Sequence, residues 1–352
     1  MATTFKTITA NDVTNTRTLL HEAIPLTGTI VSGTYSDNNV KTFSHGMFES
    51  VFDYPYLSSS ANHIFDITHG YSNTSRLSGT TAHIQNAKKI NVYNQMAAVL
   101  VGHDATGSIQ LFDRDGDIAG GGSKMEEVFF VNFSRLLTKD EIKKDSFRFK
   151  LATGSVAGNL KDHIMTIGDY GAANSYLVNS PAGEYGILYT SSATPDANSG
   201  IGHIYYQAGV AVISSSVFEG TMRGAEATAS ILGPGLASSS YPNLATGSNI
   251  QVLADSIRDR IFDINFNNTV ELNSTIYFCR ANNNEFNYSA NPTYLSSSQI
   301  RVKNTTSDNP VSYITTVGLY SSDNELLAVA KLSEPLKKDP NTELTIRVRL
   351  DY

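Results

Sequence analysis

The sequence contains no tryptophan and a single cysteine, Cys279. One thiol excludes an intramolecular disulfide, so the chain does not belong to the disulfide-stabilised class of secreted domains. Cys279 lies in the alternating apolar run STIYFCRA. In such a run a buried structural thiol is a better interpretation than a nucleophile.

Positive charge is scarce as well. The chain has 26 Lys and Arg against 33 Asp and Glu, a formal net charge of −7, and no basic block, which argues against a nucleic-acid partner. No segment approaches the roughly 18 to 20 apolar residues that span a bilayer. The first residues, MATTFKTITANDV, lack the charged start and apolar middle of a secretory signal. We therefore expect a soluble protein made in a reducing cytosol, with neither nucleic acid nor membrane as partner.

What the sequence has is length, apolar residues and uncharged polar residues. Its 352 residues are 40% hydrophobic and only 17% charged, and Ser, Thr and Asn, which suit strands, turns and contact surfaces, supply the remaining polarity. The predicted fold is mainly β with a few α-helices. Three domains are expected: a mixed α+β domain at 1–160, a charge-poor Ser/Gly/Ala-rich β region at 161–256, and an antiparallel β-sandwich or barrel-like domain at 257–352.

Helical patterns occur at three places. We expect a helix over 13–23 capped by Asp12, one over 81–103 ended by Gly102, and one over 137–144, where a capping box begins at Thr138. Alternating apolar runs between turn signals predict strands. These runs lie at 26–35, 125–137, 145–154, 184–190, 201–213, 229–232, 273–281, 298–304, 311–320, 325–332 and 343–352.

The segment FDRDGDIAGGG, at 112–122, allows two interpretations. Asp113, Asp115 and Asp117 match the first three ligand positions of an EF-hand calcium loop. Ile118 stands where that loop needs glycine, and Lys124 stands where it needs a bidentate glutamate. The dipeptide Asp-Gly also favours a tight turn. The segment is therefore an exposed acidic turn or a calcium loop.

Patterns of enzymatic chemistry are missing from the sequence. The eight histidines form no zinc-binding spacing, and neither a nucleophile elbow nor a phosphate loop is present. His203, Asp169 and a serine supply the residue types of a catalytic triad, but serine is so abundant here that such a match is expected by chance. We predict no catalytic residues, no cofactor-binding residues and no enzyme; calcium is the one candidate ligand.

An Asn-rich segment at 280–298, RANNNEFNYSANPTYLSSS, is the other conspicuous feature. One interpretation is a long loop of Asx turns, because Pro292 excludes a central strand. The other is an arm that lies on a partner subunit, with Phe286, Tyr288 and Tyr294 as aromatic anchors.

Several segments of the chain resemble virion structural proteins of large contractile-tailed phages, such as those that infect marine cyanobacteria. They are FDYPYLSSSANHIFDIT, KKINVYNQMA, FSRLLTKDEIKK, NEFNYSANPTYLSSSQIRVKN, PVSYITTVGLYSSDNELLAVAKLSEPLKK and IRVRLDY. The similarity covers about residues 20–150 and 270–352.

The resemblance implies a structural subunit of the virion, synthesised in the bacterial cytoplasm and placed in the tail baseplate. Its partners would be other baseplate, tail or neck subunits and copies of itself. Alternatives from the same reasoning are a neck or head protein, a virion-borne glycan-binding or glycan-degrading protein, and a calcium-stabilised adhesin.

Overall fold

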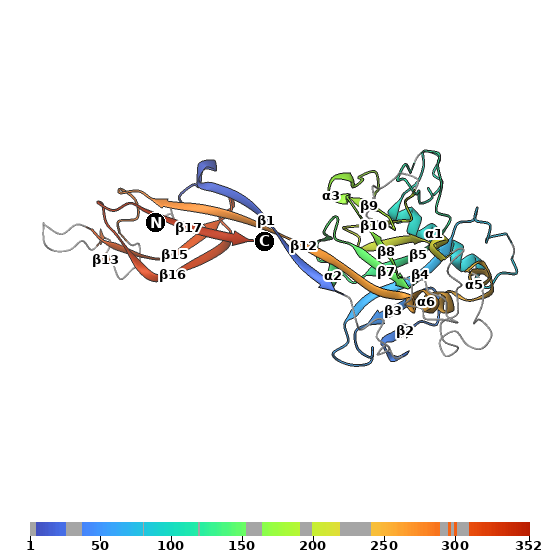
Figure 1. Ribbon diagram of the computed structural model, residues 1–352. Helices are drawn as coiled ribbons and strands as arrows, with labels where there is room; N and C mark the ends of the chain where they lie inside the picture. Colours follow the sequence, from blue (N-terminus) through green and yellow to red (C-terminus); the bar gives the residue numbers. More distant parts are fainter. Residues whose placement is uncertain are drawn as a thin grey trace. The chain divides into compact units, whose positions relative to one another are not determined.

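The protein is mainly β, with antiparallel sheets and a few short helices, as the sequence predicts (Figure 1). The computed structural model describes residues 5–25, 37–79, 81–118, 120–152, 164–190, 199–218, 241–288, 295–296, 299–300 and 310–352. The helices of these residues are α1 (Asn86–Leu100), α2 (Arg135–Thr138), α3 (Ala172–Ser175), α5 (Tyr241–Gly247) and α6 (Ile250–Arg258), with 3₁₀ turns η1 (Ala10–Asp12), η2 (Asp37–Asn39) and η5 (Ser215–Phe218).

The strands follow the chain from one end to the other. They are β1 (Val13–Pro25), β2 (Val40–Thr42), β3 (Glu49–Phe52), β4 (His63–Tyr71), β5 (Glu127–Phe133), β6 (Glu141–Ile142), β7 (Arg148–Ala152), β8 (Ile164–Gly168), β9 (Tyr185–Leu188), β10 (Gly202–Tyr205), β11 (Val210–Ser214), β12 (Ile261–Ala281), β13 (Leu295–Ser296), β14 (Gln299–Ile300), β15 (Ser312–Tyr320), β16 (Leu326–Lys338) and β17 (Leu344–Asp351). The predicted strands at 26–35 and 229–232 lie outside the described residues.

The chain forms two compact units, and this division differs from the three predicted domains. Unit 1 comprises Met1–Leu19 and Glu271–Tyr352, and unit 2 comprises Leu20–Val270. The predicted boundary near 160 is wrong because β9, β10 and β11 join the same sheet as β2 to β5. The predicted boundary near 256 is displaced because β12 is one continuous strand from Ile261 to Ala281.

Unit 2 is built on a seven-stranded antiparallel sheet in the order β2-β3-β4-β5-β11-β10-β9. Strand β5 is central, and its side chains alternate between two hydrophobic cores, one on each face of the sheet. Phe129, Val131 and Phe133 belong to the first core, which also takes side chains from β7, β12, α5 and α6. Val128 and Phe130 belong to the second core, on the face covered by α1.

Helix α1 confirms the prediction for 81–103. It ends before Gly102, whose φ of 90° is the left-handed conformation that glycine adopts at helix ends, and whose N–H donates to Ala97 O at 2.9 Å. Gly70 of β4 lets α1 approach the sheet, because a Cβ there would lie 2.7 Å from Lys89 O.

Two other helix predictions are wrong. Residues 13–23 lie in strand β1, which pairs with β12. In the segment 137–144, helix α2 has already ended at Thr138 because Lys139 adopts a left-handed φ of 56°. Glu141 and Ile142 then form β6 against β12, so the capping-box spacing marks no helix start.

The described part of unit 1 contains three sets of paired strands, of which the short pair β13–β14 is the smallest. The second half of β12 pairs with β17 from Ser274↔Asp351 to Ala281↔Leu344 and also borders β1. Strands β15 and β16 form a separate hairpin, joined through the predicted turn at 321–324, where Asn324 N–H donates to Ser321 O at 3.1 Å. In β17 the predicted alternation is confirmed, since Arg347 and Arg349 are exposed and Val348 between them is buried.

Candidate functional site

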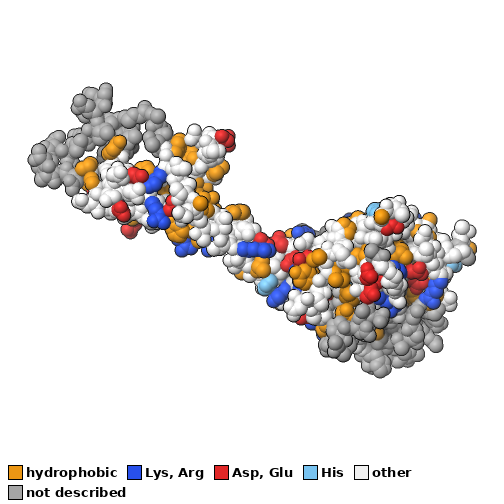
Figure 2. Space-filling model, turned by 90° about the horizontal axis from the view of Figure 1, so that it is seen from above, with side chains coloured by type: hydrophobic (Ala, Val, Ile, Leu, Met, Phe, Trp, Pro, Cys, Tyr) orange, Lys and Arg blue, Asp and Glu red, His pale blue; other side chains and the backbone are white. Residues whose placement is uncertain are grey.

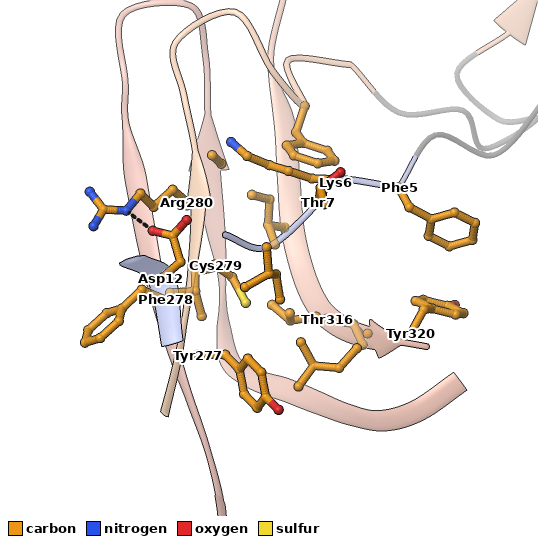
Figure 3. Close-up of a pocket in the computed structure, with 18 of the residues that line it drawn as sticks. Phe5, Lys6, Thr7, Asp12, Tyr277, Phe278, Cys279, Arg280, Thr316 and Tyr320 are labelled. Atoms are coloured by element: carbon orange, nitrogen blue, oxygen red, sulfur yellow. Dashed lines mark hydrogen bonds and ion pairs between the residues drawn. The ribbon is translucent and has the colours of Figure 1, made fainter. Parts of the chain in front are cut away.

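A groove of about 1070 Å³ opens inside unit 1 (Figure 3). The N-terminal segment 5–13, the end of β12 and the whole length of β15 line it. We call it the unit 1 groove. Residues of β12 and Ile346 of β17 line one side, and β15 lines the other.

The end of β12 lines the groove with consecutive residues, from Tyr277 to Ala281. The Cys279 side chain points into the groove in Figure 3. Ile346 of β17, which lies opposite Cys279 in the antiparallel register, also lines the groove.

Cys279 is half-buried rather than fully buried, so the prediction of a buried thiol holds only in part. Burial, together with the negative charge of Asp12, raises the pKa of Cys279 above its usual value of 9.0. The thiol is therefore protonated at neutral pH, and its environment does not activate it as a nucleophile.

Aromatic side chains surround the groove. The rings of Phe5 and Tyr320 pack with centroids 4.7 Å apart. A Cβ on Gly318 would lie 2.9 Å from the Tyr320 ring, so this glycine makes room for that ring on β15. The predicted anchors Phe286 and Tyr288 both line the groove, with exposed fractions of 49% and 58%. The third predicted anchor, Tyr294, lies outside the described residues.

The charged side chains that line the groove are held in ion pairs. Asp12 accepts from Arg280 Nε at 2.6 Å, and hydrogen bonds from Thr9 and Arg280 hold the pKa of Asp12 below its usual value. Lys6 forms an ion pair with Glu285. Both pairs connect the N-terminal segment to β12 or to the residues just after it, and they leave the groove walls dominated by aromatic, aliphatic and threonine side chains.

The acidic loop is organised around a lysine. Lys124 Nζ donates to Asp113 Oδ2 at 2.5 Å, to Gly120 O at 2.9 Å and to Ile118 O at 3.3 Å. The ammonium group thus lies among the oxygens that would otherwise surround a cation. Asp115 and Asp117 instead accept from backbone N–H groups of the loop.

The turn interpretation of this loop is correct in its backbone and wrong in its exposure. Gly116 has a φ of 81°, and Asp113 forms a bridge with Lys124 as in a hairpin. Asp113, Gly116 and Ile118 are buried, because the loop packs against the second core of unit 2 and is not an exposed tip. The calcium interpretation of Asp113, Asp115 and Asp117 stays a prediction. Within the described part of the chain, no group of three or more His, Cys, Asp or Glu side chains is arranged to hold a metal.

The other polar residues considered from the sequence have structural partners. His203 is fully buried, with Nε2 2.6 Å from Asp113 O. Asp169 is also fully buried and accepts from Tyr206 Oη at 2.9 Å and Arg148 Nη1 at 3.0 Å. None of the described helices is long and apolar enough to cross a membrane.

Glu49 of β3 is a buried carboxyl group that the sequence does not reveal. It is 1% exposed, and neither of its oxygens has a hydrogen-bond partner among the described residues. Burial and the negative charge of Asp255 raise the pKa of Glu49 to about 9, although Arg258 opposes the shift. The side chain is therefore protonated at neutral pH.

This shift predicts how stability depends on pH. A carboxyl group whose pKa is higher in the folded than in the unfolded state stabilises the fold fully below its unfolded pKa, and the stabilisation disappears as the pH rises towards 9. We expect the melting temperature of the wild type to fall between pH 5 and pH 9. Glu49→Gln should melt about 5 °C higher than the wild type at pH 9 and within about 1 °C of it at pH 4. Thermal melts with the exposed Glu22→Gln as control test this; equal pH slopes in wild type and Glu49→Gln would contradict it.

No protein-family model, no curated protein and no solved structure matches the chain. Aromatic side chains at the rim of the groove stay exposed within the described part of unit 1. The groove can therefore bind a largely apolar partner surface.

Proposed function

We propose that the protein is a non-enzymatic structural subunit of a tailed-phage virion and that its place is the tail baseplate. It acts by docking unit 1 on neighbouring subunits. The observation that supports assembly is the poor packing of unit 1. The two hydrophobic cores formed by the described residues consist entirely of side chains from unit 2.

Unit 1 buries little and exposes much. Among its described residues, the buried apolar ones are Ile276, Ala281, Leu319 and Val348. Its exposed large apolar residues are Phe5, Ile8, Leu19, Phe286, Tyr288, Tyr313, Tyr320, Leu326, Leu327, Val329, Leu336 and Tyr352. Hydrophobic side chains are visible on the surface of this unit in Figure 2. Apolar surface on this scale marks an interaction site in a soluble protein.

The hairpin β15–β16 also exposes more side chains than it buries. Most of its side chains are exposed, and an isolated two-stranded hairpin is marginally stable in water. Its strands pair only with each other among the described residues. A neighbouring subunit that covers one face or extends one edge would supply the missing packing.

The virion assignment is supported by the sequence resemblance, which is densest in this same unit. The segments 310–338 and 346–352 that resemble phage virion proteins form β15, β16 and β17. Part of the sequence that resembles these phage proteins thus carries exposed apolar side chains, among them Leu326, Leu327 and Val329.

Cryo-electron microscopy and mass spectrometry of particles from the phage that carries the gene test this proposal. We expect the chain in several stoichiometric copies per particle, with unit 1 in contact with neighbouring subunits. Absence of the chain from purified, infectious particles would contradict the proposal, and so would turnover of host polysaccharide by the purified protein.

A further inference from the structure

We propose that the occupant of the unit 1 groove is a second copy of this chain, which inserts the exposed apolar residues of its own β16. This inference rests on the proposed function and identifies one of the partners that the assembly requires. Three observations support it: the groove and a matching apolar ridge lie in the same unit, unit 1 carries no net charge, and the groove has the size of a protein interface.

The ridge consists of Leu326, Leu327 and Val329 on β16, which are 53%, 68% and 51% exposed. Strand β15, the hairpin partner of β16, lines the groove along its whole length. A Cβ on Gly318 would lie 2.9 Å from the Tyr320 ring and 3.3 Å from Leu326 Cδ1, so this end of the ridge lies beside a side chain that lines the groove. A two-fold contact needs groove and ridge close together, because each copy must offer both halves of the contact to the other.

The net charge of unit 1 does not oppose contact between two copies of it. Unit 1 contains ten Lys and Arg and ten Asp and Glu, so its formal net charge is zero. Unit 2 contains 16 basic and 23 acidic residues and carries the whole net charge of −7. Like-charge repulsion therefore opposes contact between two copies of unit 2 and does not oppose contact between two copies of unit 1.

The dimensions of the groove favour a polypeptide over a small ligand. Its 28 lining residues match the roughly 20 to 30 residues that each partner contributes to a standard protein interface. Its volume of about 1070 Å³ is at the upper limit of small-molecule pockets, which reach about 1,000 Å³. The charged residues that line the groove are already in ion pairs, Asp12 with Arg280 and Lys6 with Glu285, so an apolar insert leaves no lining charge newly unpaired there.

Sedimentation velocity of the full chain from about 0.1 to 100 µM tests the proposal. We expect a concentration-dependent dimer in the wild type, and a dissociation constant at least about 30-fold weaker in Leu327→Glu, as for a buried hot-spot residue. Leu136→Glu is a matched control, because Leu136 is 70% exposed but lies in unit 2. It should associate as the wild type does.

Cys279 provides a second, independent measurement. It is the only thiol in the chain and it lines the groove. Its rate of reaction with a disulfide reagent in the native protein should fall severalfold as the wild type passes from monomer to dimer, and should stay constant in Leu327→Glu. Circular dichroism of both variants verifies that they are folded.

Each other outcome overturns the inference. A dimer that survives Leu327→Glu with Cys279 still reactive is formed by another surface. A wild type that stays monomeric up to 100 µM shows that the groove does not take a second copy. If that monomer is nevertheless found in purified particles with unit 1 against a different subunit, the proposed function stands while this inference fails.

Discussion

Replacing Lys89 by methionine is expected to lower the free energy of unfolding of unit 2 by about 3 to 5 kcal/mol and its melting temperature by roughly 10 °C. Lys89 lies in α1 and has no exposed surface. Its Nζ donates to Ile84 O at 2.8 Å and to Ala245 O and Ser248 O at 2.6 Å each. Methionine keeps the apolar stem of the side chain and removes all three donors.

The size of the effect follows from where these carbonyl groups lie. Ala245 is in the last turn of α5 and Ser248 follows it, so their carbonyls belong to the helix end that lacks internal donors. Buried acceptors left without a donor cost about 1 to 3 kcal/mol each. Although burial lowers the pKa of Lys89 to about 8, the ammonium is still mostly charged at neutral pH, and a charged donor at the negative end of a helix adds to the loss.

The neighbouring lysine is the control for this prediction. Lys88 is exposed and donates to His45 O at 2.7 Å. Lys88→Met should change the free energy of unfolding by less than about 1 kcal/mol, because water can replace the lost donor. Urea unfolding followed by circular dichroism measures both variants. Equal stability of Lys89→Met and Lys88→Met would contradict the assigned role of the buried ammonium.

Lys124→Met is expected to destabilise unit 2 by about 2 to 4 kcal/mol and to create a dependence on cations that the wild type lacks. Without the ammonium, the fully buried Asp113 carboxylate faces the carbonyls of Ile118 and Gly120 with no positive charge. Calcium binds sets of carboxylate and carbonyl oxygens. Calcium at millimolar concentration should therefore raise the melting temperature of Lys124→Met by several degrees.

The wild type decides between the two interpretations of this loop. Because Lys124 already neutralises Asp113, we expect its melting temperature to differ by less than about 1 °C between calcium and a chelator. A rise of several degrees with calcium would favour the calcium loop at Asp113, Asp115 and Asp117. Asp117→Asn is the control, since Asp117 is exposed and its side chain accepts only a backbone N–H in the described loop. It should lose less than about 1 kcal/mol.

Local patterns predicted some of the elements. Helix α1 was found from its apolar periodicity and its terminal glycine, and both determine its geometry in the fold. The strands of the last ninety residues were found from alternation and turn signals. In each case the pattern itself is local, although the partners are not: β17 pairs with β12 about 70 residues earlier in the chain.

Errors arose where the partner is distant in sequence. Residues 13–23 have a helix-compatible pattern, yet β1 pairs with β12, about 250 residues away, and tertiary pairing overrides weak propensity. The boundary near 160 failed for the same reason, since β11 lies beside β5 in the sheet. Glu49 and Lys89 were missed because only burial distinguishes them from surface residues of the same types.

The candidate site was found in part. Phe286 and Tyr288 were predicted as anchors from their aromatic character in an Asn-rich segment, and both line the groove. Phe5 and Tyr320, which pack together on its rim, were not predicted, because their contact joins opposite ends of the chain. The groove needs the N-terminal segment, β12 and β15 at once, and no local window contains more than one of them.

Two buried lysines can also report on local opening of the two units. Lys89 in unit 2 and Lys338 in unit 1 are both fully inaccessible, and Lys338 Nζ donates to Asn287 Oδ1 at 2.7 Å and Asp339 O at 2.8 Å. An amine-reactive label can reach either nitrogen only when its surroundings open, so the two labelling rates report two separate opening equilibria. If the packing of unit 1 depends on a partner, assembly should slow acylation of Lys338 and leave that of Lys89 unchanged.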